Sequence, residues 1–199
     1  MKKIILMRHS IPDRTIKCLN NDIPLSSEGI LKAECFFKHS EFKDVKEVYT
    51  STYRRAKQTA KIFTNNIITD DRIIERKIGD IKSNSKSFWK KQYDDYNYKN
   101  QDGESLNEVC LRMDLFIKEV LRKMEDGQTV LIVSHATAIC AYLTKYCEIT
   151  VIDEKEKTRK IKHNNKIVLN GKIDTPSMFV LSFDKGKMTY IEYKDESII

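Results

Sequence analysis

Short apolar runs that end abruptly in polar residues recur along the chain. Residues 3–7 and 129–133 are almost wholly apolar, and the first run stops at Arg8-His9 while the second stops at Ser134-His135. Runs of this length predict strands buried on both faces. A third strand is predicted at Val45–Thr50.

Helical spacing of apolar residues follows these strands. A serine that can cap a helix lies within Pro24–Gly29, and a long amphipathic helix is predicted from Glu104 to just before Asp126-Gly127. Three helices are expected, with these apolar positions: Ile30, Ala33 and Phe37; Ala56, Thr59, Ala60 and Phe63; and Leu106, Val109, Cys110, Met113, Phe116, Val120 and Met124.

Two segments carry less pattern, and the chain closes with a hairpin. Residues 80–103 are polar and predict a variable insertion over one face, while residues 151–172 are charged and Asn-rich. Residues 178–183 and 188–193 flank Asp184-Lys185-Gly186-Lys187 and predict a hairpin. Alternating strands and helices predict an α/β three-layer sandwich with a mostly parallel central sheet flanked by helices.

Composition favours one domain over residues 1–199, because 40% of its 199 residues are hydrophobic and 33% are charged. The N-terminal apolar run is too short for an export signal or a membrane span. Five widely spaced cysteines form no C-x-x-C pair, which argues against a disulfide framework or a zinc site. We therefore expect a cytoplasmic protein that does not bind a membrane.

The formal charge is +7, and its basic residues look scattered among acidic ones. This distribution favours a solvated surface over a nucleic-acid footprint, so no nucleic-acid partner is expected. The excess of basic over acidic residues gives only weak support for a small phosphorylated substrate. The oligomeric state cannot be read from the sequence.

Polar residues at the predicted strand ends suit metal-independent cleavage of a phosphate monoester. Ligands gather at the carboxyl ends of parallel strands, where Arg8, His9 and His135 fall. His9 would be the nucleophile, while Arg8 and the helix-opening Arg55 would neutralise the phosphoryl oxygens. No metal or other cofactor is expected.

The remaining roles have weaker support in the sequence. His135 would be a second oxygen ligand, with the backbone N–H of Ala136 as another donor. Glu75 is the best candidate for the general acid, and Glu104 is the alternative. A histidine after an apolar strand is, taken singly, more often structural than catalytic.

The order of these motifs resembles the histidine phosphatase superfamily, which includes the cofactor-dependent phosphoglycerate mutases. The resemblance spans residues 2 to about 145, and its motifs are Arg8-His9, Asp22–Ser26 with Gly29, Ser51–Ala60, Gly103-Glu104-Ser105 and Ser134-His135. It implies a phosphoglycerate mutase-like fold and phosphorylation of His9, with Arg8, Arg55 and His135 around the phosphoryl group. Motif alignment selects Arg55 over its neighbour Arg54.

The sequence departs from the family pattern on the substrate side. Ser10 replaces the usual glycine after Arg-His, Pro12 lies where polar donors are common, and Ile81-Lys82-Ser83 replaces an expected aromatic and Glu-Gly pair. Substrate identity therefore does not transfer.

A phosphoric monoester hydrolase of the phosphatase type is favoured, because the mutases carry a longer enclosing segment before the late strand. Alternatives are mutase-type phosphoryl transfer, a non-catalytic domain that binds phosphorylated ligands or partners, and a phosphoprotein phosphatase.

Trp89 and the tyrosines of the insertion would form either a specificity wall or a small satellite core.

Overall fold

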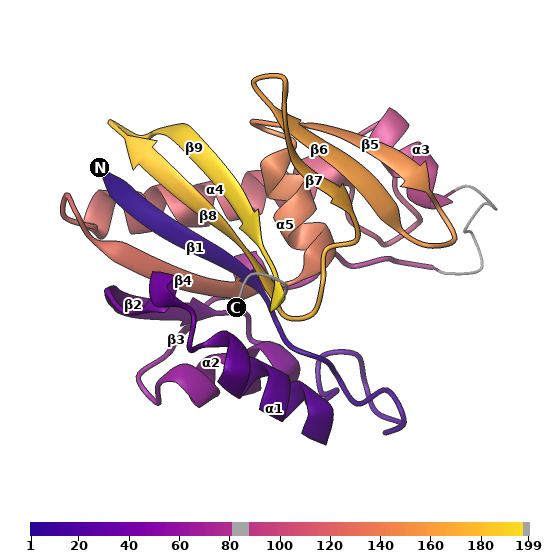
Figure 1. Cartoon of the computed structure of the whole chain (residues 1–199). Helices are drawn as coiled ribbons and strands as arrows, with labels where there is room; N and C mark the ends of the chain where they lie inside the picture. The colour runs from indigo at the N-terminus through magenta and orange to yellow at the C-terminus, as the bar shows by residue number, and fades with distance from the viewer. Residues whose placement is uncertain (81–87, 197–199) are drawn as a thin grey trace.

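The computed structural model describes residues 1–80 and 88–196 and is built around one six-stranded sheet (Figure 1). Its strand order is β3-β2-β4-β1-β8-β9. The first four of these strands run parallel, and β8 and β9 continue the sheet antiparallel. The strands are β1 (Lys2–Arg8), β2 (Val45–Thr50), β3 (Ile68–Thr69), β4 (Thr129–Ser134), β8 (Ser177–Asp184) and β9 (Lys187–Lys194). The mostly parallel sheet and the C-terminal hairpin are confirmed.

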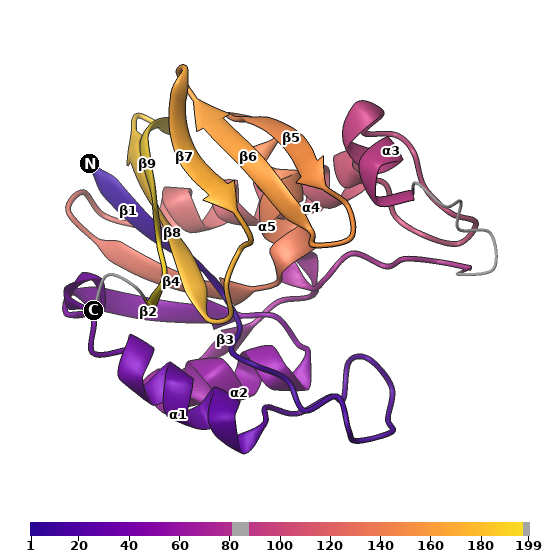
Figure 2. The same ribbon diagram turned by 45° about the vertical axis from the view of Figure 1, so that its right-hand side comes forward.

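Helices cover both faces of this sheet, which confirms the three-layer sandwich. Figure 2 shows α1 and α2 on one face and α4 and α5 on the other. The helices are α1 (Ser27–Phe36), α2 (Arg54–Phe63), α3 (Phe88–Asp94), α4 (Leu106–Lys123) and α5 (Ala136–Leu143), with short 3-10 turns at Ser40–Phe42 and Asp71–Ile73.

Successive side chains of the central strands point to opposite faces of the sheet and join two separate hydrophobic cores. Ile4 and Leu6 of β1 pack on the α4 and α5 side, whereas Ile5 and Met7 pack on the α1 and α2 side. All four side chains are fully buried. A strand buried on both faces shows no polar alternation, which is why the sequence reads as an apolar run there.

The predicted α1 has the right start but a different buried face. Ser26 caps it by accepting a hydrogen bond from the Gly29 N–H, at 3.0 Å. Its buried positions are Gly29, Ala33 and Phe36, so Ile30, expected to be buried, is 39% exposed. The apolar stripe is thus rotated from the predicted one, because Gly29 allows close packing that the pattern did not weigh.

The predicted start of α4 is confirmed, although the helix begins two residues later than Glu104. Ser105 and Glu108 form a reciprocal capping box, with the Ser105 side chain accepting from the Glu108 N–H and the Glu108 side chain accepting from the Ser105 N–H. Such a cap stabilises a helix by about 1 kcal/mol. The capping interpretation of the Gly-Glu-Ser motif therefore holds for Ser105.

A second, three-stranded antiparallel sheet occupies the charged segment to which the sequence assigned no structure. Its strands, in order, are β5 (Glu148–Asp153), β6 (Thr158–His163) and β7 (Lys166–Gly171). Asn164 and Asn165 form the β6–β7 turn with positive φ angles, a conformation that asparagine tolerates. Ile149, Ile161 and Leu169 join the core beneath this sheet.

The predicted insertion at residues 80–103 lies partly outside the described residues, because Ile81, Lys82 and Ser83 fall within 81–87. Its described part contains α3. Across residues 1–80 and 88–196, no helix combines the length and apolar character needed to span a bilayer.

Candidate active site

The carboxyl ends of β1 and β4 bring His9 and His135 together. His9 follows β1 and His135 follows β4, and the two strands are parallel neighbours. The ring centroids lie 4.9 Å apart. Arg55, in the first turn of α2, contacts both rings. The predicted convergence of these three residues is present.

Hydrogen bonds fix the tautomer of His9. Its Nδ1 lies 2.7 Å from the Ser10 carbonyl oxygen, which can only accept, so Nδ1 carries the proton. Its Nε2 accepts a hydrogen bond from Arg55 Nε at 3.0 Å. Burial, together with the guanidinium groups of Arg55 and Arg8, holds the pKa of His9 well below the ordinary histidine value. The ring is therefore neutral, with the Nε2 lone pair on the Arg55 side.

Arg55, and not Arg54, belongs to the site. Arg55 is 3% exposed and reaches both histidines, while its Nη1 donates to the carbonyl of Asn20. Arg54 is exposed. Adjacent helical residues point about 100° apart, so only one of the two can face the sheet edge.

His135 lies deeper in the site than its predicted role as a phosphoryl ligand requires. It is fully buried, its Nδ1 faces Arg55 Nη2 at 3.3 Å, and its Nε2 lies 2.8 Å from Ser51 Oγ. Because a guanidinium only donates, Nδ1 accepts and Nε2 donates to the serine. Burial, His9 and Arg55 keep the pKa of His135 well below its usual value.

Glu75 is anchored at the N-terminus of α5. Its carboxylate accepts hydrogen bonds from the backbone N–H groups of Arg76 (2.8 Å), Thr137 (3.3 Å) and Ala138 (3.0 Å). First-turn N–H groups have no acceptor within their own helix, so an anion is favoured there. Ala136 opens α5 and lines the same cavity as Glu75.

Glu104, the alternative acid, is held elsewhere. It forms an ion pair with Arg112 at 2.8 Å and accepts from the Lys77 N–H. It is absent from the described residues that line the cavity, whereas Glu75 is among them.

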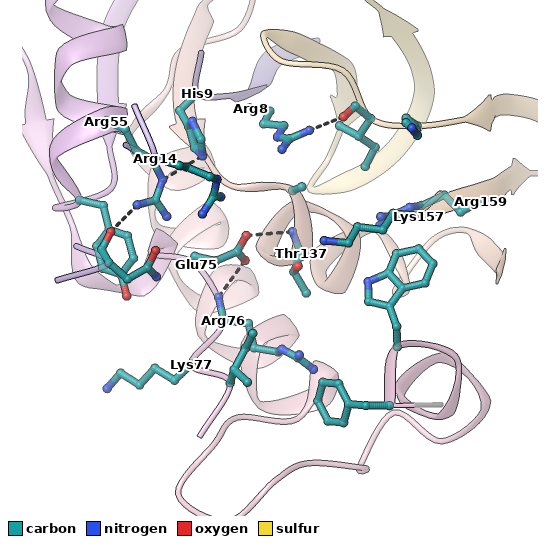
Figure 3. A pocket seen from close by; sticks show the side chains of 18 of the residues that line it. Arg8, His9, Arg14, Arg55, Glu75, Arg76, Lys77, Thr137, Lys157 and Arg159 are labelled. Carbon is teal, nitrogen blue, oxygen red and sulfur yellow. Dashed lines mark hydrogen bonds between the residues drawn. The ribbon is translucent and has the colours of Figure 1, made fainter. Parts of the chain in front are cut away.

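The site opens into a cavity of about 860 Å³ with a strongly basic wall (Figure 3). Arg8, Arg14 and Arg55 lie near His9, and Arg8 donates to the Ile173 carbonyl. Figure 3 shows Lys157 and Arg159 across Glu75 from His9, with Arg76 and Lys77 below. The expectation of scattered charge is wrong in three dimensions, because folding gathers distant basic residues around one cavity.

Ser10, which replaces the usual glycine after Arg-His, is fixed by two hydrogen bonds. Its Oγ donates to the Gly29 carbonyl at 2.6 Å, and its N–H donates to Thr59 Oγ1 at 3.0 Å. A Cβ at Gly29 would lie 2.2 Å from the Ile11 carbonyl oxygen, so only glycine fits here. Pro12 forms an isolated bridge with Leu25.

Several lining or supporting residues were missed by the sequence analysis. Ser51 holds His135 through its hydroxyl, and Asn20 holds Arg55 through its backbone carbonyl, a group that no residue type reveals.

Arg159 was also missed, although it faces inward from β6. The alternation of Arg159 with Ile161 was the sequence signal that could have indicated this. Trp89 lines the cavity and packs against the main core cluster, whereas the sequence analysis expected either a specificity wall or a separate satellite core. Across the described residues, no cluster of three His, Cys, Asp or Glu side chains is arranged to hold a metal ion.

Several solved structures, including two phosphatases, share this fold. The chain superposes on mycobacterial glucosyl-3-phosphoglycerate phosphatase with a TM-score of 0.68 and 19% identity, covering 90% of this chain and 89% of that one. For YhfR of Bacillus stearothermophilus the TM-score is 0.62 and the identity is 22%, with 95% of each chain covered. For the phosphoserine phosphatase of Entamoeba histolytica, solved with phosphoserine, the values are 0.65 and 15%, over 96% of this chain and 97% of that one.

Sequence comparison identifies the family. A search among curated proteins found no match. The family model described as histidine phosphatase superfamily (branch 1) matches residues 4–169, which is most of the chain and includes the strand ends, α2 and Glu75. The chain therefore belongs to branch 1 of the histidine phosphatase superfamily.

Proposed function

We propose that this protein is a metal-independent phosphatase that hydrolyses phosphate monoesters through a phosphohistidine intermediate on His9. The observation that carries the proposal is the tautomer of His9. Its Nδ1–H is committed to the Ser10 carbonyl, so Nε2 is the nitrogen that can attack, and it lies at the edge of a cavity with arginines around it.

In the first step, Nε2 of His9 attacks phosphorus and the bond to the leaving oxygen breaks. Before this attack, Arg55 releases its hydrogen bond to Nε2, which frees the lone pair, and turns its guanidinium, with that of Arg8, to the equatorial phosphoryl oxygens. We propose that the carboxylic acid form of Glu75 gives its proton to the leaving oxygen. The low pKa of His9 supports this role, because an imidazolium has no lone pair to attack with.

In the second step, water attacks the phosphohistidine. Glu75, now a carboxylate, accepts the proton of that water, the P–N bond breaks, and inorganic phosphate leaves. His135 contacts both His9 and Arg55, so we propose it as a further phosphoryl ligand once Arg55 has turned. The Ala136 N–H at the α5 terminus is proposed as another donor.

We also propose that the protein works in a reducing compartment, the cytoplasm. All five cysteines are free, and two of them, Cys18 and Cys35, are exposed.

The test is intact mass spectrometry of wild type and His9→Ala, quenched at alkaline pH after mixing with p-nitrophenyl phosphate, together with release of free phosphate. We expect a phosphoryl adduct and phosphate release from the wild type alone, both persisting in EDTA. Unchanged release from folded His9→Ala would refute the phosphohistidine route, and a strict need for added Mg²⁺ would refute metal independence.

A further inference from the structure

The residues that line the cavity carry a net positive charge equal to that of the whole chain. Nine cationic side chains and two carboxylates line the cavity, giving it a formal charge of +7. The complete chain has 36 basic and 29 acidic residues, also +7. The residues outside the cavity are therefore balanced at 27 of each sign. One phosphate monoester brings about two negative charges, so phosphoryl binding alone leaves most of this positive charge unmatched.

Two of the cations lie on a wall away from His9 and are buried without an ion pair. Arg159 of β6 and Arg76, which follows Glu75, are each 5% exposed. Neither takes part in any ion pair between described residues, and the Nε of each is buried with no hydrogen-bond partner among them. A buried guanidinium without a counter-charge is costly, and an arriving anion would remove that cost.

These guanidinium groups are held in place by aromatic, thiol and amide side chains. Arg159 stacks over Trp89 at 4.6 Å, and its Nη1 donates to Tyr93 Oη (3.0 Å) and Cys140 Sγ (2.7 Å). Arg76 stacks over Phe88 at 4.7 Å and donates through Nη1 to Gln92. These contacts orient the groups without forming an ion pair, and the Glu75 carboxylate acts on both only through space, so the arrangement is that of a preorganised anion site.

The β5–β6 turn adds two more cations to this pair. Lys155 and Lys157 line the cavity without an ion pair among the described residues, while Glu156 between them is engaged by Lys172 at 2.9 Å. Figure 3 shows Lys157 extending into the cavity toward Glu75. The volume of about 860 Å³ is near the upper end of pockets that hold drug-sized ligands, so a substrate larger than a simple phosphate ester fits.

We propose that Arg76, Lys157 and Arg159 form a second anion-binding subsite, and that the substrate is a phosphate ester whose far end carries another anionic group. This inference rests on the proposed function, because His9 defines which end reacts. The shared chemistry of the distal group is a phosphoryl or a carboxylate, and the test distinguishes them.

The test measures binding instead of turnover, so that it stands apart from the test of the phosphohistidine route. Titration calorimetry on the wild-type protein would compare alkane monophosphonates with α,ω-bisphosphonates and ω-phosphonocarboxylates of increasing chain length, none of which can be hydrolysed. At the chain length that spans the cavity, we expect the doubly anionic ligand to bind at least tenfold more tightly than the monophosphonate. The distal group that gives the tighter binding, phosphonate or carboxylate, indicates which anionic group the natural substrate carries at its far end.

Two variants on the same hairpin sharpen this test. Lys157 has a φ of 56°, so Lys157→Asn removes the charge while keeping a residue that tolerates this conformation. It should weaken only the doubly anionic ligands, several-fold. Lys160→Ala is the matched control, because Lys160 follows Arg159 on β6 and points to the opposite face. Equal affinity for mono- and dianionic ligands at every length, or an equal effect of both variants, would overturn the proposal.

Discussion

The two ends of the cavity are built in opposite ways. At the His9 end, hydrogen bonds tie the two histidines and Arg55 together: Arg55 contacts both histidines, His135 contacts Ser51, and His9 contacts the Ser10 carbonyl. At the far end, Arg76 and Arg159 are fixed by aromatic rings and keep their charge unpaired. The first end rests on parallel strands shared with the family fold, and the second on α3 and the small sheet. If both proposals hold, chemistry and substrate recognition lie on different parts of the fold.

The largest expected effect at the His9 end concerns Glu75 and depends on the leaving group. Glu75→Gln keeps an oxygen to cap α5 but cannot donate a proton to the leaving oxygen. We expect kcat to fall about 10³-fold with an alkyl phosphate and far less with p-nitrophenyl phosphate, whose leaving group scarcely needs protonation. Steady-state kinetics on both esters measures the difference. Glu104→Gln is the control and should leave the ratio unchanged; a shift there instead would move the acid to Glu104.

A second expected effect, about 10²-fold in kcat, concerns the two neighbouring arginines. Arg55→Lys keeps the charge but loses the fork that spans His9 and His135, so both the ring positions and the phosphoryl contacts suffer. Arg54→Lys, one residue away and exposed, should change kcat less than twofold. Similar losses in the two variants would show that the helix, and not the Arg55 contacts, carries the effect.

The smallest effect is on stability and again separates the two ends. Both His9 and His135 have lowered pKa values in the folded state, so below pH 6.5 the unfolded chain binds protons that the folded chain does not. The free energy of unfolding should therefore fall as pH drops below about 6.5, by at most about 1.4 kcal/mol per pH unit for each histidine. Urea unfolding at pH 7.5 and 5.5 measures this loss.

The matched variants for that measurement are His135→Gln and Lys157→Asn. The first should flatten the pH dependence by removing one buried histidine, while the second, at the far end, should leave it unchanged. A wild-type stability that stays level down to pH 5.5 would mean that neither histidine is held neutral.

The sequence predicted the His9 end of the cavity better than the far end. Arg8 ends β1, and His9 and His135 directly follow β1 and β4, so the rule that ligands gather at strand ends was sufficient to bring them together. The far end lies in β5–β7, where only one face of the sheet meets the core and polar residues dominate the sequence. Period-two alternation is weak there, and the Asn164-Asn165 turn was the usable signal.

Contacts through the backbone were beyond prediction for a different reason. The carbonyls of Ser10 and Asn20 orient His9 and Arg55, yet any residue type supplies a carbonyl. The gathering of charge was missed because Arg8, Arg76 and Arg159 are far apart in sequence and meet only after folding. Residue type indicates chemistry, but position in space comes from topology.

The charge balance outside the cavity bears on how the protein behaves on a charged resin. A molecule whose net positive charge comes from one concave region should adhere to a cation exchanger through that face, since the remainder carries 27 groups of each sign. A small dianionic ligand that fills the concavity would then release the protein at a concentration far below that of the sodium chloride needed for the same elution. The active-site face would thus serve as its own purification handle.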